Sequence, residues 1–189
     1  MKTASDPRHI RRVKLMQALY TASFRKKPGV LIKDIWGHLV LIDLFIVKSA
    51  PQWPLSRINP VDLAILRLAT WELVVDKTAP VRVIIDESVE LAHEFGSDHS
   101  WGFINGVLGN IVKNMQKRTA IIQFLANEWQ REPDSITSDI ILSDMGNTQD
   151  LLTKLQDALD LTAPEGWESS INNVGELLEA FDPQLEIDE

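Results

Sequence analysis

Apolar side chains recur every three or four positions between residues 58 and 117, and this spacing predicts three consecutive amphipathic helices. The first is expected to begin at Asn59-Pro60, because asparagine is a favoured N-cap and proline fits the first helical turn. The second is expected to follow Pro80 and end at Gly96, and the third to start at Trp101. Together they predict a packed helical bundle. The acidic residues of the second helix are expected to face mostly outward: Asp86, Glu87, Glu90 and Glu94.

Two more helices are predicted upstream of this block. Residues 9–24 place Val13, Met16 and Tyr20 on one side of a helix. Residues 32–47 form a candidate core helix, since their isoleucines and leucines recur at intervals of four, three and four. The fold class predicted for the whole chain is therefore all-α.

The first predicted helix is strongly basic. Residues 1–33 carry nine lysines and arginines against the single acid Asp6, a local net charge of +8, which attracts polyanions. Tyr20 adds a flat ring near the cations, and that combination suits single-stranded RNA better than a duplex. The alternative is a solvated basic helix with Tyr20 packed at the edge of the core.

Five segments of the chain carry residue choices that helix formation alone does not require: Arg11–Tyr20, Ile65–Leu73, Pro80–Ala92, Phe95-Gly96 and Phe103–Leu108. In their order and spacing they closely resemble the NusB family of transcription antitermination factors. The resemblance covers about residues 7–118 and implies a NusB-like helical fold. The chain departs from the family pattern in two places. It is shorter between Tyr20 and Asn59, where one helix looks shortened or absent, and Gly109 stands where family members commonly have an aspartate.

The resemblance implies a function and a set of contact residues. NusB-type proteins bind boxA, a short single-stranded element of nascent transcripts, together with the ribosomal protein NusE in the RNA polymerase antitermination complex. Carried over by position, the RNA-facing candidates are Arg8, Arg11, Arg12, Lys14 and Tyr20. The candidates for the face that binds a protein partner are Trp71, Glu72 and Pro80.

The charge changes sign along the chain. Residues 1–118 carry a net charge of +6 and residues 119–189 a net charge of −14, which predicts two functional parts with a boundary near Arg118. The apolar positions after residue 119 are too numerous and too regular for a disordered tail, so an acidic helical domain is expected there. Because Ile121 and Leu125 continue the preceding apolar pattern, the boundary is expected to lie inside or beside a continuous helix.

About residues 121–185 resemble an acyl or peptidyl carrier domain, on loose motifs. These are Ile136–Gly146, Leu155–Leu161 with Pro164, and Asn173-Val174. Carrier domains hold phosphopantetheine on a serine shortly after a glycine, and no serine occupies that position after Gly146 here, although Thr148 is near. The module is read as carrier-like without its prosthetic arm, and the alternative is an unrelated acidic extension. It could dock another protein, or it could fold back on the basic helix and compete with RNA.

Catalysis finds little support in the sequence. Without cysteine, thiolate chemistry and zinc–thiolate sites are excluded. The four histidines show no paired metal-ligand spacing and are expected at the surface or core edge, and the chain has no P-loop, nucleophile elbow or dinucleotide motif. Three glycine-containing pairs are interpreted as helix boundaries or points of close packing: Phe95-Gly96, Trp101-Gly102 and Asn105-Gly106. No enzyme activity, metal or cofactor is predicted.

The chain has neither a signal-peptide pattern nor an apolar run long enough to span a membrane, which predicts a cytoplasmic protein without membrane contact. The function predicted is transcription antitermination, or rRNA transcription and maturation, by binding boxA-type RNA with a ribosomal-protein partner. The alternative is a protein–protein adaptor that works through its acidic module without RNA.

Overall fold

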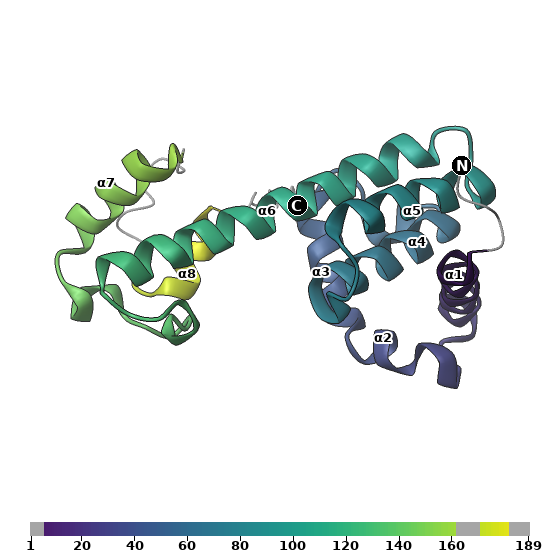
Figure 1. Cartoon of the computed structure of the whole chain (residues 1–189), viewed down its shortest axis with the longest axis horizontal. Helices are drawn as coiled ribbons and strands as arrows, with labels where there is room; N and C mark the ends of the chain where they lie inside the picture. The colour runs from purple at the N-terminus through teal and green to yellow at the C-terminus, as the bar shows by residue number, and fades with distance from the viewer. Residues whose placement is uncertain (1–5, 162–170, 182–189) are drawn as a thin grey trace. The chain divides into compact units, whose positions relative to one another are not determined.

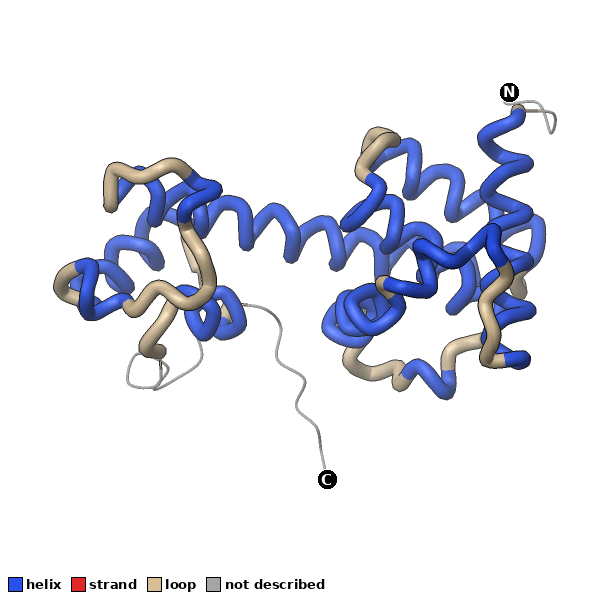
Figure 2. Tube along the Cα trace, turned by 90° about the horizontal axis from the view of Figure 1, so that it is seen from below, coloured by secondary structure: helices blue, strands red, loops and turns tan. Residues whose placement is uncertain are grey.

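The computed structural model describes residues 6–161 and 171–181, and the chain divides into two compact units, Met1–Val112 and Lys113–Glu189. The described residues form helices and loops, as Figure 2 shows, so the all-α prediction is confirmed. The α-helices are α1 (Pro7–Arg25), α2 (Lys33–Gly37), α3 (Leu39–Ser49), α4 (Pro60–Trp71), α5 (Val81–Phe95), α6 (Ser100–Glu128), α7 (Thr148–Leu159) and α8 (Val174–Ala180). The shorter turns are η1 (Val30–Ile32), η2 (Leu55–Arg57), η3 (Glu72–Asp76), η4 (Pro133–Ser135) and η5 (Leu142–Met145).

Helix α4 lies at the centre of the first unit, where it packs against α1, α3 and α5 (Figure 1). Its start is as predicted, because the Asn59 side chain accepts a hydrogen bond from the Val61 N–H at 2.8 Å and Pro60 occupies the first turn. Ile65, Leu66 and Leu68 are fully buried, and each contributes about 1.5–3 kcal/mol by leaving water. The core of this unit is thus built around α4.

Helix α1 begins and ends with recognisable caps. The Asp6 side chain accepts a hydrogen bond from the Arg8 N–H at 2.8 Å, and the chain leaves the helix through Lys26 in the left-handed conformation at φ 50°. Leu15, Met16 and Leu19 are buried. The predicted first helix is confirmed, and its apolar side faces the core.

The single helix predicted over residues 32–47 is wrong, because the structure breaks it into α2 and α3. At the break His38 has φ −102° and ψ 10°, and its N–H bonds to the Ile35 carbonyl three residues back. Gly37 precedes the break, and glycine inside a helix costs about 1 kcal/mol relative to alanine. The apolar pattern survives the break, since Ile35, Ile42 and Ile46 are all buried.

Gly96 ends α5 as predicted, and a close approach explains the residue type. A Cβ atom at this position would lie 2.5 Å from the Ser100 Cβ, so α5 and α6 approach too closely for any other residue. The next helix is longer than the predicted Trp101–Lys117, because α6 continues to Glu128. The two units meet between Val112 and Lys113, so the division of the chain falls inside the continuous helix α6.

The second unit has a hydrophobic core of its own. Ile121 and Leu125 of α6 pack with Leu152 and Leu155 of α7 and with Leu177 of α8. Asn147 caps α7 and Asn173 caps α8 through side-chain oxygens that accept backbone N–H groups. The described residues of the acidic segment therefore form a folded helical unit. Pro164, part of the carrier-like motif, lies outside the described residues.

Candidate nucleic-acid interface

The outer side of α1 carries exposed cations. Arg11 and Lys14 are exposed, one turn apart, and neither has an ion-pair partner among the described residues. Arg8 is also exposed, but its guanidinium is bound to the Asp6 carboxylate at 3.0 Å, and this hydrogen bond raises the pKa of Arg8. Two of the predicted RNA-facing cations, Arg11 and Lys14, are thus available to a phosphate without first breaking a bond.

An aromatic pair lies farther along the same helix. Tyr20 is 38% exposed, and its ring makes an edge-to-face contact with the Phe24 ring, with centroids 5.0 Å apart. Phe24 is 63% exposed. At 100° per residue, the side chain of Tyr20 leaves the helix about 120° around its axis from that of Lys14. The exposed cations and the aromatic rings therefore lie on different sides of α1. The sequence reasoning missed Phe24, although its spacing of four from Tyr20 was the available signal.

Arg12 lies inside the protein, so the expectation that it is exposed on the basic helix is wrong. Its side chain is 8% exposed, and its Nε donates to both carboxylate oxygens of Glu72 at 3.0 Å. A second guanidinium nitrogen lies 3.7 Å from Glu87. Because Glu72 opens η3 and Glu87 lies on α5, Arg12 ties α1 to both elements. Glu87 is buried as well, contrary to the outward position expected for it.

Two of the three residues predicted for the partner face are also buried. Trp71 is 6% exposed, and its indole N–H donates to Asp34 at 3.2 Å, while Glu72 is held by Arg12. Only Pro80 lies at the surface, next to the exposed Val81. The geometry gives Trp71 and Glu72 a role in holding neighbouring helices.

A cleft of about 440 Å³ opens elsewhere on the first unit. Trp53 and Phe103 meet edge to face at its wall, with ring centroids 5.5 Å apart. Gly102 and Gly106 of α6 line it, and a Cβ at either position would touch nothing within 4 Å. The interpretation of these two glycines as close packing points is therefore wrong. Trp53 is half exposed, so the cleft offers an apolar surface.

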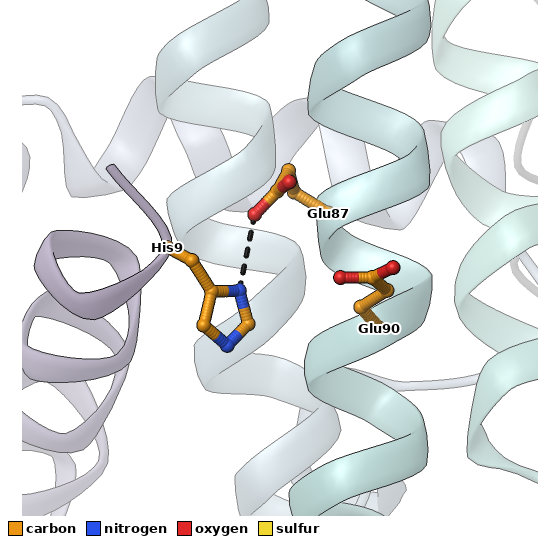
Figure 3. A group of neighbouring side chains, drawn as sticks. All are labelled: His9, Glu87 and Glu90. Atoms are coloured by element: carbon orange, nitrogen blue, oxygen red, sulfur yellow. Dashed lines mark hydrogen bonds and ion pairs between the residues drawn. The ribbon is translucent and has the colours of Figure 1, made fainter. Parts of the chain in front are cut away.

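His9 meets carboxylates of α5 at the start of α1 (Figure 3). Its Nδ1 lies 3.1 Å from Glu87 and its Nε2 lies 3.3 Å from Glu94. Partial burial lowers the pKa of His9, but the hydrogen bonds to Glu87 and Glu94 outweigh it and raise the pKa overall. His9 lies at the core edge, as expected, but in a polar cluster that the sequence pattern did not reveal.

Comparison with known proteins decides the family. A model of the NusB family matches residues 29–113. A solved structure of NusB from Thermotoga maritima superposes with a TM-score of 0.52 at 32% sequence identity, covering 60% of this chain and 93% of that one. This chain belongs to the NusB family. The resemblance and the NusB-like fold predicted from the sequence are confirmed.

Curated NusB relatives each match a little under half of the chain. The transcription antitermination protein NusB of Roseiflexus castenholzii is 44% identical over 91 residues, which are 47% of this chain and 64% of the relative. The corresponding protein of Chloroflexus aggregans is 45% identical over 84 residues, 43% of this chain and 56% of the relative. The match thus spans about three fifths of these relatives. Membership in NusB agrees with the prediction of a non-enzymatic protein.

The NusB match ends at residue 113, where the second unit begins. The comparisons provide no support for a carrier-like domain beyond it, so that resemblance stays a prediction. Across the part of the chain that the structure describes, no helix is both long enough and apolar enough to cross a membrane.

Proposed function

We propose that this NusB-family chain acts in transcription antitermination and rRNA transcription by binding boxA-type single-stranded RNA on the outer side of α1. The observation that carries the proposal is the exposed pair Arg11 and Lys14 on a helix held rigidly against the core. Lysine and arginine bind phosphates and release counterions, which supplies most of the affinity for a nucleic acid. Membership in a family of transcription antitermination proteins supports RNA as that polyanion.

The aromatic pair supports unpaired RNA as the ligand. Tyr20 and Phe24 are exposed and one turn apart, and an unstacked base can lie on such rings. Each stacked base is worth about 1–3 kcal/mol by alanine substitution. In this proposal Arg11 and Lys14 hold the backbone and the two rings hold bases, while Arg8 contributes after releasing Asp6.

Arg12 was predicted from the sequence to face RNA, but we propose that it supports the RNA site from inside the protein. Its guanidinium is engaged by Glu72 and Glu87, so it orients α1 and leaves phosphate binding to its neighbours. Arg12 is therefore proposed as a positioning residue.

The protein partner, proposed to be the ribosomal protein NusE, needs a docking surface. Because Trp71 and Glu72 are buried, we propose the cleft lined by Trp53 and Phe103 as that surface, with Pro80 as a separate exposed candidate. Aromatic side chains beside a hollow are typical anchors of protein interfaces. Association with RNA polymerase in an antitermination complex follows from the same proposal.

Binding of a boxA-like oligonucleotide, measured by fluorescence anisotropy across salt concentrations, tests the RNA site. The double variant Arg11→Ala/Lys14→Ala is expected to bind more weakly and to reduce the salt slope by about 1.4, at about 0.7 per phosphate contact for a single strand. Arg57→Ala, which removes an exposed arginine of η2, is the matched control and is expected to leave both unchanged.

The second candidate function is a protein–protein adaptor acting through the acidic second unit. The second unit, residues 113–189, carries a net charge of −11, which favours a basic protein partner for it. Absence of specific boxA binding by the full chain would support the adaptor over the RNA-binding function.

A further inference from the structure

We propose that His9, Glu87 and Glu90 form a binding site for a divalent transition-metal ion of the Zn²⁺ type, which links α1 to α5. One ligand atom from each residue lies within 4.8 Å of the other two. Figure 3 shows the His9 ring from α1 directed toward the two carboxylates of α5. The site goes beyond RNA and partner binding, since it uses none of the exposed cations or rings.

The distances suit a metal with few adjustments. His9 Nδ1 and Glu87 Oε2 are 3.1 Å apart. Ligand atoms bound at about 2.1 Å in a tetrahedron lie about 3.4 Å from one another, so these two already have nearly the required separation. Glu90 follows Glu87 by one helical turn and is exposed, which lets its side chain move to complete the group. Three protein ligands leave a fourth position open for water.

The charge of the cluster also favours a cation. His9 faces Glu87, Glu90 and Glu94, so three carboxylates surround one imidazole. Cations offset only part of this charge, because Arg12 lies 3.7 Å from Glu87 while it also binds Glu72 at 2.9 Å, and Arg8 binds Asp6 at 3.0 Å. A proton on His9 compensates one negative charge, whereas a divalent ion compensates two.

The residue types point to the class of metal. Imidazole favours zinc, nickel, copper and iron over magnesium and calcium, which prefer all-oxygen sites. Because the metal needs the unprotonated imidazole nitrogen, it competes with a proton for His9. Affinity is therefore expected to rise with pH through the range in which His9 loses its proton.

Isothermal titration calorimetry of the tag-free full chain with ZnCl₂ tests the site. The expected result is one Zn²⁺ bound per chain, and visible absorption bands on loading with Co²⁺. Loss of a residue that only hydrogen-bonds to a metal ligand weakens metal affinity by about 10–100-fold. Because His9 and Glu90 are proposed as ligands themselves, His9→Gln and Glu90→Gln are each expected to weaken Zn²⁺ binding by at least about tenfold. His99→Gln changes an exposed histidine outside the cluster and is expected to bind as the parent does.

Circular dichroism of each variant shows whether it is still folded, so loss of the metal site can be told from loss of the fold. Because Glu90 is exposed, Glu90→Gln is the variant expected to disturb folding least. The inference is overturned if the folded parent binds no Zn²⁺ at neutral pH. It is equally overturned if His9→Gln and Glu90→Gln retain the parental affinity, because the metal would then lie elsewhere.

Discussion

At the scale of single residues, neighbouring arginines of α1 do different work. Arg11 and Arg12 are adjacent in sequence, so their side chains leave the helix about 100° apart. Arg11 faces solvent, while Arg12 enters the core and meets Glu72. The same residue type is thus a candidate phosphate ligand at one position and an internal tie at the next.

This difference predicts that the two arginines contribute very unequally to the free energy of unfolding. Arg12→Ala leaves Glu72 buried without its cation and is expected to lower the free energy of unfolding by about 3–5 kcal/mol. Arg11→Ala removes an exposed side chain and is expected to change it by no more than about 0.5 kcal/mol. Urea unfolding followed by far-UV circular dichroism measures both, and equal losses in the two variants would contradict the assignment.

His9 predicts a pH-dependent contribution to stability. Its pKa in the folded protein is raised above the ordinary value of 6.5, so the protonated ring binds the carboxylates of α5 more favourably than it binds water. The stability supplied by this ring is fully present below pH 6.5 and is lost as the pH rises through the folded pKa.

The measurement is the difference in unfolding free energy between the parent and His9→Gln, followed from pH 5 to pH 8 with a chelator present. A difference that is larger at the acidic end supports the interaction. A difference that grows toward pH 8 would show that the ring is favoured in its neutral form.

At the scale of elements, the contact between the end of α5 and the start of α6 leaves no room for a side chain at Gly96. Gly96→Ala places a Cβ 2.5 Å from the Ser100 Cβ and is expected to destabilise the protein by about 1–3 kcal/mol through overpacking. Gly106→Ala lies in the helix interior with open space beside it and is expected to stabilise by about 0.5–1 kcal/mol. Thermal melts compare the pair, and a similar loss in both would refute the steric explanation.

The helices themselves could be predicted from the sequence, and their partners could not. The periods of three and four residues correctly placed α1 and the cap of α4, because these depend on local spacing and local hydrogen bonds. The polar contacts of α1 join residues far apart in sequence. Arg12 and Glu72 are separated by 60 positions, and His9 and Glu87 by 78. Periodicity within one helix carries no information about which carboxylate will lie opposite a given cation.

The break between α2 and α3 was missed for a related reason. The isoleucines continue in phase across Gly37 and His38, so an apolar pattern alone predicts one helix. The exposed glycines of the cleft were misjudged because sequence does not tell whether a glycine borders another helix or open space. Gly96 and Gly106 illustrate the two cases.

At the scale of the whole molecule, opposite charges are divided between two units that each have a core. The first unit, residues 1–112, carries a net charge of +3, and the second, residues 113–189, carries −11. Charges in water act over about 10 Å at 0.1 M salt and about 30 Å at 0.01 M. An acidic unit therefore opposes the approach of RNA most strongly at low ionic strength.

Removal of residues 121–189 is expected to raise the affinity for boxA-like RNA at low salt, with the difference from the full chain fading as salt increases. Fluorescence anisotropy at several salt concentrations measures this, after circular dichroism has verified that the shortened chain is folded. Equal affinities and equal salt slopes would dismiss any effect of the acidic unit on RNA binding.

The cleft beside Gly102 and Gly106 of α6 can be filled by substitution. Because no atom lies within 4 Å of a Cβ at either position, a large side chain there occupies the cleft without changing the packing of the core. The lining of that cleft contains no residue of α1. One substitution is therefore expected to block the proposed partner surface while leaving the proposed RNA surface intact, so the two proposed activities can be tested separately.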